Sequence, residues 1–191
     1  EVDIQPVKTS DENEMDLNVR VAEQQTGNFA LGAGYSSDDA AFGEVSLEER
    51  NLFGKGQLGK VSTRISSEEI LYKLSFFEPY ILDSDYSGGI DLYKEEKEYD
   101  YYDKDSLGMT LSAGYLLFEY TRIGLQYNIE DFDISNVDSV NTYMTAGSFL
   151  TSSIKPSITY DSRNDFFLPT KGSTHKFSIQ YAGEFLGGDI D

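Results

Sequence analysis

The 191-residue sequence contains no cysteine, no tryptophan, one histidine, and only 15 Lys and Arg against 34 Asp and Glu. Without cysteine there can be no disulfide framework, thiolate metal site or cysteine nucleophile. Because His175 is the single histidine, most imidazole chemistry is also excluded. A formal net charge of −19 argues against a nucleic-acid-binding module, because phosphate contacts need clustered Lys and Arg.

Long apolar runs are also missing. No window reaches the roughly 18 consecutive apolar residues of a transmembrane helix, which excludes a helical membrane protein. A membrane β-barrel stays possible, because its strands alternate apolar and polar residues over about ten positions and leave the mean hydropathy unremarkable. The 14 Tyr and 12 Phe are too many for a disordered acidic tail, so we expect a folded chain.

Apolar residues alternate with small or polar residues through most of the chain. The alternating segments are residues 17–21, 29–35, 45–47, 61–65, 70–76, 90–92, 107–115, 123–129, 154–160 and 177–181. This period of two predicts an all-β protein whose sheet has one apolar and one wet face. A soluble antiparallel sheet and a membrane barrel with a water-filled lumen both fit, and periodicity does not separate them.

The connections between these segments differ in size. We expect short turns at residues 51–56, 79–85, 116–119 and 168–172, and long polar loops at 95–106 and 131–153. The two kinds tend to alternate along the chain, which predicts turns on one rim and loops on the other. Tyr and Phe also collect at segment ends. Both features are typical of outer-membrane barrels.

Four short blocks carry a family resemblance. They are GNFALGAGYS (27–36), ERNLFGKG (49–56), LSFFEPY (74–80) and YDSRNDFFLPTKG (160–172). In sequence, order and spacing they resemble the BamA-type outer-membrane assembly factors of the bacterial surface antigen superfamily. In that family, periplasmic POTRA domains precede a barrel of about sixteen strands.

The resemblance implies a division of the chain. Residues 1–26 correspond to the end of the last POTRA domain and its join to the barrel, and residues 27–191 to the N-terminal part of the barrel. We therefore expect an antiparallel meander of about nine strands, half of a transmembrane β-barrel in the bacterial outer membrane. The Arg-Gly motif of the family's lumen loop and the closing strand are absent from this sequence.

The resemblance also implies a function without covalent chemistry, so we expect neither an enzyme nor a bound cofactor or metal. The family folds and inserts outer-membrane proteins through a lateral seam at the first barrel strand. Its partners would be unfolded β-barrel clients, assembly-machinery lipoproteins and outer-membrane lipid, with no nucleic acid. The alternative is a polypeptide-secretion transporter of the same superfamily.

In this sequence the client-pairing strand would run over residues 28–35. Its members are Asn28, Phe29, Ala30, Leu31, Gly32, Ala33, Gly34 and Tyr35. Glycine weakens a strand and lets another backbone approach closely, which suits a strand that pairs with varied clients. The two glycines could equally relieve crowding within a barrel wall.

Two further groups of residues have expected roles. Asp161 and Arg163, two positions apart on one strand face, would point into the lumen and help seat the family's lumen loop, or merely solvate the interior. Periplasmic turns are expected at Glu78, Pro79 and Tyr80, and again at Pro169 and Gly172. The acidic stretch with Asp100, Asp103 and Asp105 lacks the pattern of a calcium loop and is interpreted as a solvated outer loop.

Overall fold

The computed structural model describes residues 2–8, 15–22, 25–36, 40–138, 145–165 and 167–189. The strands are β1 (Val2–Lys8), β2 (Met15–Val21), β3 (Gly27–Ser36), β4 (Ala40–Leu52), β5 (Gln57–Ser66), β6 (Glu69–Glu78), β7 (Tyr86–Tyr99), β8 (Tyr102–Phe118), β9 (Thr121–Ser135), β10 (Gly147–Asp161), β11 (Thr174–Ser178) and β12 (Tyr181–Ala182). Two short 3₁₀ turns, η1 (Ile81–Asp83) and η2 (Glu184–Leu186), complete the elements. In the described ranges, no helix is long and apolar enough to cross a membrane.

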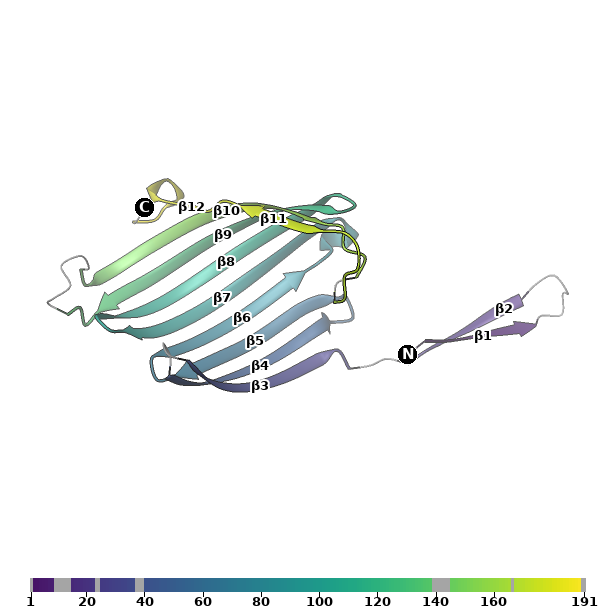
Figure 1. The fold of residues 1–191 in the computed structure, drawn as a ribbon, viewed down its shortest axis with the longest axis horizontal. Helices are drawn as coiled ribbons and strands as arrows, with labels where there is room; N and C mark the ends of the chain where they lie inside the picture. The colour runs from purple at the N-terminus through teal and green to yellow at the C-terminus, as the bar shows by residue number, and fades with distance from the viewer. Residues whose placement is uncertain are drawn as a thin grey trace.

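The strands form two antiparallel sheets. In the large sheet, β3 to β11 lie side by side in chain order, and β12 pairs with β10 outside that path (Figure 1). The small sheet is the β1–β2 hairpin, which lies apart from the large one (Figure 1). The expected all-β antiparallel meander is thereby confirmed.

β12 continues the line of β11 along β10. β11 pairs with residues 157–161 of β10, and β12 with Ser153 and Ile154. Between these stretches the amide of Ile179 donates to the carbonyl of Pro156 at 3.3 Å. Proline has no amide hydrogen to return that bond, which explains why the ladder is interrupted there.

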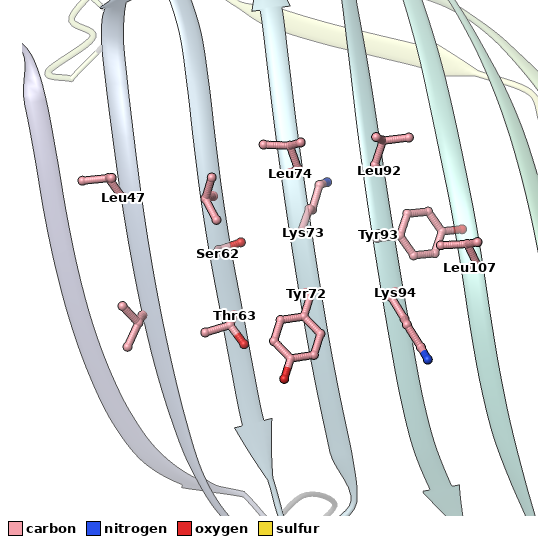
Figure 2. Close-up of a pocket in the computed structure, with 12 residues that line it drawn as sticks. Leu47, Ser62, Thr63, Tyr72, Lys73, Leu74, Leu92, Tyr93, Lys94 and Leu107 are labelled. Atoms are coloured by element: carbon pink, nitrogen blue, oxygen red, sulfur yellow. The ribbon is translucent and has the colours of Figure 1, made fainter.

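The cross-strand register places the alternating apolar residues from Phe29 onward on one face of the large sheet. Starting from Phe29, direct partners include Leu47, Val61, Leu74, Leu92, Met109 and Ile129. Leucines of β4, β6, β7 and β8 line a shallow apolar groove there, and Figure 2 shows Leu47, Leu74, Leu92 and Leu107. The opposite face carries most of the small and polar residues, as the period-two pattern predicts, together with a few aromatic rings such as those of Phe42, Phe77 and Tyr93.

Neither face of the sheet is covered by a packed core. Among the described residues, Phe132 is the one large hydrophobic side chain that is buried, at 9% exposure. Leu31, Leu74 and Leu107 instead stand open on the apolar face. Such a continuous exposed apolar surface is the lipid-facing side of a membrane barrel.

The expectation of a long loop at residues 95–106 was wrong. β7 extends to Tyr99, β8 begins at Tyr102, and the rings of these two residues stack with centroids 4.6 Å apart. The charged segment has no apolar alternation, but Lys94 Nζ lies 3.0 Å from Glu96 and 3.5 Å from Asp105 across the hairpin. Ion pairs and backbone hydrogen bonds extend the hairpin where hydrophobic burial does not.

The expected division into short turns and long loops by rim was also wrong. Consecutive connections of a meander do alternate between two rims, but β5 to β6 and β7 to β8, expected on the loop rim, are joined by two residues each. On the turn rim, residues 162–173 form a long connection. Its base continues the hairpin, because Ser162 N donates to Ser173 O at 2.9 Å and Asn164 N to Lys171 O at 3.1 Å.

Candidate functional site

β3 is the terminal strand of the large sheet. It pairs with β4 from Gly27 opposite Glu49 to Ser36 opposite Ala40. Within the described residues no other strand lies against its second edge. The expected client-pairing residues Asn28, Phe29, Ala30, Leu31, Gly32, Ala33, Gly34 and Tyr35 therefore all lie on an edge strand.

The side chains of β3 alternate between the two faces. Phe29, Leu31, Ala33 and Tyr35 lie on the apolar face, where Leu31 is 74% and Tyr35 80% exposed. Asn28, Ala30, Gly32 and Gly34 lie on the polar face. An exposed edge of this kind presents unpaired backbone amides and carbonyls to another strand.

The two glycines of β3 have different surroundings. A Cβ added to Gly32 would meet no atom within 4 Å, whereas one on Gly34 would lie 2.6 Å from Cζ of Phe42. Gly34 therefore makes room for an aromatic ring, and Gly32 does not. The explanation from crowding fits Gly34 alone.

The start of β3 is also joined to β4 by side-chain contacts. The hydroxyl of Thr26 donates to Glu49 Oε1, and a Cβ on Gly27 would lie 3.2 Å from Glu49 Oε2. Glu49 Oε1 also accepts the amide of Asn51 at 2.9 Å. These bonds connect the entry to β3 with the turn between β4 and β5.

Asp161 and Arg163 form a two-pronged ion pair. Arg163 Nε donates to Asp161 Oδ1 at 2.9 Å, and Nη2 to Oδ2 at 2.6 Å. Asp161 lies on the polar face, opposite Thr174. β10 ends at Asp161, so Arg163 lies in the connection that follows the strand rather than on the strand itself.

The expected turn residues lie at the turn rim. Glu78 ends β6, accepts the amide of Tyr80 at 3.1 Å, and accepts Gln57 Nε2 at 2.5 Å. Pro79 follows directly and has no amide hydrogen with which to continue the strand ladder. In the other connection, Pro169 lies near the tip and Gly172 near the base, with φ of 91°.

The sequence did not predict a hydrogen-bonded network on the polar face. Tyr93 Oη donates to Glu130 Oε2 at 2.6 Å, Lys104 Nζ donates to Glu130 Oε1 at 2.5 Å, and Thr110 donates to Asn128 at 2.7 Å. The residues belong to β7, β8 and β9 and become neighbours through strand register. In the sequence, polar residues at alternate positions were the sole sign of such a network, and they do not specify which side chains bond to one another.

The described part of the chain holds no cluster of three or more His, Asp or Glu side chains placed to bind a metal. Its acidic residues are instead spread along strands. Asp103 and Asp105, expected in an outer loop, belong to β8, and Asp100 lies in the tight turn before it.

A protein-family comparison identifies the chain. The family model of the Omp85 superfamily domain matches residues 51–191. The chain belongs to the Omp85 superfamily. The match covers most of the large sheet, from the last two residues of β4 onward.

One relative is similar over the whole chain. The outer membrane protein assembly factor BamA of Nitratidesulfovibrio vulgaris is 30% identical over 194 residues, which covers 100% of this chain and 24% of the relative. The chain thus spans about a quarter of the length of that relative. With the superfamily match, this similarity places the chain in the bacterial outer membrane.

Two solved structures share the fold. BamA from Haemophilus ducreyi lacking POTRA domains 1–3 superposes with a TM-score of 0.74 at 17% identity, covering 99% of this chain and 40% of that one. CdiB from Acinetobacter baumannii gives 0.57 at 14% identity, covering 96% and 37%. At these identities the likeness concerns the fold, and it agrees with part of a barrel. The Nitratidesulfovibrio relative is an assembly factor by name rather than an enzyme.

Proposed function

We propose that this chain takes part in folding and inserting outer-membrane β-barrel proteins, and that β3 supplies the edge with which an incoming client strand pairs. The observation that carries the proposal is the position of β3 at the end of the sheet, with no second partner strand in the described residues. Membership of the Omp85 superfamily and the assembly function in the relative's name support it.

The chemistry of such an edge suits clients of different sequence. A strand that adds to a sheet is held by main-chain hydrogen bonds, while side chains only adjust the choice. Small residues Ala30, Gly32 and Ala33 let a second backbone approach closely, and nothing lies within 4 Å of a Cβ built on Gly32. No covalent step is needed.

The remaining roles follow from the same proposal. Residues 1–26 would belong to the last POTRA domain and its join, and residues 27–191 to the barrel. Unfolded β-barrel proteins, accessory lipoproteins of the assembly machinery and lipid would be the partners. Asp161 and Arg163 would face the lumen, and Glu78, Pro79, Tyr80, Pro169 and Gly172 the periplasm.

A polypeptide-secretion transporter of the same superfamily is the second candidate. It would share the barrel but pass a soluble protein through it. Both solved structures cover nearly the whole chain, and BamA superposes with the higher TM-score, 0.74 against 0.57 for CdiB. A shared fold does not by itself separate the two functions. The behaviour of the β3 edge during client assembly does.

The test uses the absence of cysteine from the sequence. Ala30→Cys is introduced in the intact protein, and single cysteines are placed along the last strand of a client barrel protein. Disulfide formation is then scored during assembly in membranes. The matched control is Ser75→Cys on β6, which lies on the same polar face but between two paired strands.

A transient crosslink at Ala30→Cys, whose preferred client position shifts by two when the cysteine moves to Gly32→Cys, supports the proposal. The Ser75→Cys control should give none. If no position from Asn28 to Tyr35 crosslinks while the protein is folded in the membrane, β3 is not the client edge, and the secretion transporter becomes the better candidate.

A further inference from the structure

We propose that Glu49 and Phe42 are positioning residues that fix the register of β3 against β4, and that they thereby fix the register in which β3 is offered to another strand. The register in which β3 is offered to another strand rests on the proposed function. The register of β3 against β4 concerns the protein without a client and can be tested alone.

The middle of β3 specifies its register weakly. Gly32 of β3 and Gly43 of β4 each have no atom within 4 Å of a built Cβ. A slip of one residue would turn every side chain to the wrong face, but a slip of two would keep the apolar residues on the apolar face. Backbone pairing alone therefore does not exclude the slipped arrangements.

Each end of the β3–β4 pair has a bulky side chain placed over a glycine. At the start of β3, Glu49 lies beside Gly27, with Oε2 3.2 Å from a built Cβ, and accepts the hydroxyl of Thr26. Near the other end, the ring of Phe42 lies over Gly34, with Cζ 2.6 Å from a built Cβ. Both are direct cross-strand pairs, on opposite faces of the sheet.

Only the native register satisfies both pairs. The two glycines and the two bulky residues have the same spacing along their strands, so the contacts form together. Slipping by two in one direction would set Gln25 opposite Glu49 and Gly32 opposite Phe42, so Glu49 alone opposes this slip. Slipping the other way would set Phe29 opposite Glu49 and Ser36 opposite Phe42, where the ring fills the space.

The ring of Phe42 is itself held from β5. The guanidinium carbon of Arg64 lies 4.3 Å from the ring centroid. Arg64 Nε lies 3.4 Å from Glu69 Oε2, and Lys97 Nζ lies 3.9 Å from Glu69 Oε1. A cation over an aromatic face is attractive, and its ion pair with Glu69 restricts where the guanidinium can lie. The register of β3 is thus connected to β5, β6 and β7.

Pairs of cysteines measure the register directly in the intact protein. Ala30→Cys with Ser46→Cys reports the native register, because these residues are direct partners. Ala30→Cys with Glu48→Cys or with Glu44→Cys reports slips of two in either direction. Direct partners have Cβ atoms about 5 Å apart and diagonal ones about 7 Å, so disulfide formation discriminates between them.

With Glu49 and Phe42 present, the native pair should give most of the crosslinks. Glu49→Ala should raise the ratio of slipped to native crosslinks by about fivefold, as expected for losing one contact. Phe42→Ala should raise it similarly, but only for the slip that Glu48→Cys reports, which sets Ser36 opposite residue 42. Phe42→Tyr, which keeps the ring, should leave the ratio unchanged. Phe77→Ala is the matched control, since Phe77 lies on the same polar face but on β6.

Two milder variants keep the test decisive if the alanine variants fold poorly. Thr26→Val removes the hydroxyl that Glu49 accepts, and Arg64→Gln removes the cation over the ring. Each should raise the ratio by about two- to fivefold. If the ratio of slipped to native crosslinks is unchanged in folded Thr26→Val and Arg64→Gln proteins, the proposal is overturned. Slipped crosslinks as frequent as native ones in the unchanged protein would overturn it too.

Discussion

The ring of Tyr93 lies over Gly108, its direct cross-strand partner on the polar face of the sheet. A Cβ added to Gly108 would lie 2.1 Å from Cζ of Tyr93 and 2.3 Å from its hydroxyl oxygen. With the ring in this position, the hydroxyl donates to Glu130, which also accepts a bond from Lys104. A missing side chain on β8 thus allows β7 and β9 to be joined across it.

Replacing Gly108 with alanine should destabilise the barrel. The added methyl group must displace the Tyr93 ring and break its bond to Glu130, which should lower the free energy of unfolding by about 1–3 kcal/mol. Urea titration of the intact protein in lipid vesicles, followed by the gel mobility of the folded barrel, measures the change.

Two variants separate the steric effect from the hydrogen bond. Gly43→Ala is the matched control, because a built Cβ on that strand glycine meets no atom within 4 Å, and it should change the unfolding midpoint little. Tyr93→Phe keeps the ring and loses only the bond to Glu130. It should therefore lower the free energy of unfolding by less than Gly108→Ala does. Equal effects of Gly108→Ala and Gly43→Ala would contradict the packing argument.

Gly172 should tolerate no side chain. Its φ is 91°, and a built Cβ would lie 2.1 Å from the carbonyl oxygen of Ser162, which is backbone and cannot turn aside. Gly172→Ala should therefore open the base of the 162–173 connection. Limited proteolysis of the intact protein should show faster cleavage after Lys171.

Gly56 provides the comparison for that variant. Its φ of 70° is also positive, but a built Cβ has open space around it. Gly56→Ala should cost only the backbone penalty of about 1–2 kcal/mol and leave the 162–173 connection resistant. Equal cleavage after Lys171 in both variants would show that the contact with Ser162 is unimportant.

The tip of the same connection should respond to acid. Asp165 Oδ1 accepts the amides of Leu168 and Phe167, both at 2.8 Å, and these bonds hold the pKa of its carboxyl below the ordinary 3.8. Because the folded-state pKa is lowered, the stabilisation is present above the ordinary value and is lost as the pH falls through the lowered one.

Amide chemical shifts of Phe167 and Leu168, followed by NMR between neutral and acidic pH, measure this titration. Their common midpoint should lie below 3.8, and it should vanish in Asp165→Asn. A midpoint at or above the ordinary value would mean that the two amides do not stabilise the carboxylate.

Much of the fold could be predicted, because alternation is a local property of the chain. Residues 107–115 and 123–129 show apolar and small or polar positions in turn, and both segments lie in strands with the expected faces. The charged residues 95–106 carry no such signal. They are strand because their neighbours extend the ladder, and ion pairs from Lys94 cross between the two strands.

The candidate site divides in the same way. The alternation of residues 28–35 predicts a strand with one apolar face and one face of small residues. Their assignment to a barrel edge came from the family resemblance. The ring of Phe42 over Gly34, and that of Tyr93 over Gly108, could not be predicted. Each depends on which residue lies opposite which.

The sequence by itself determined the alternating strands, the two faces and the exclusion of cysteine and nucleic-acid chemistry, because composition and period-two alternation are independent of partners. Tertiary structure decided the register, the lengths of the charged strands and the contacts of Glu49 and Phe42 with β3. Register joins residues that are distant in the chain, and it is selected by the summed fit of whole strands.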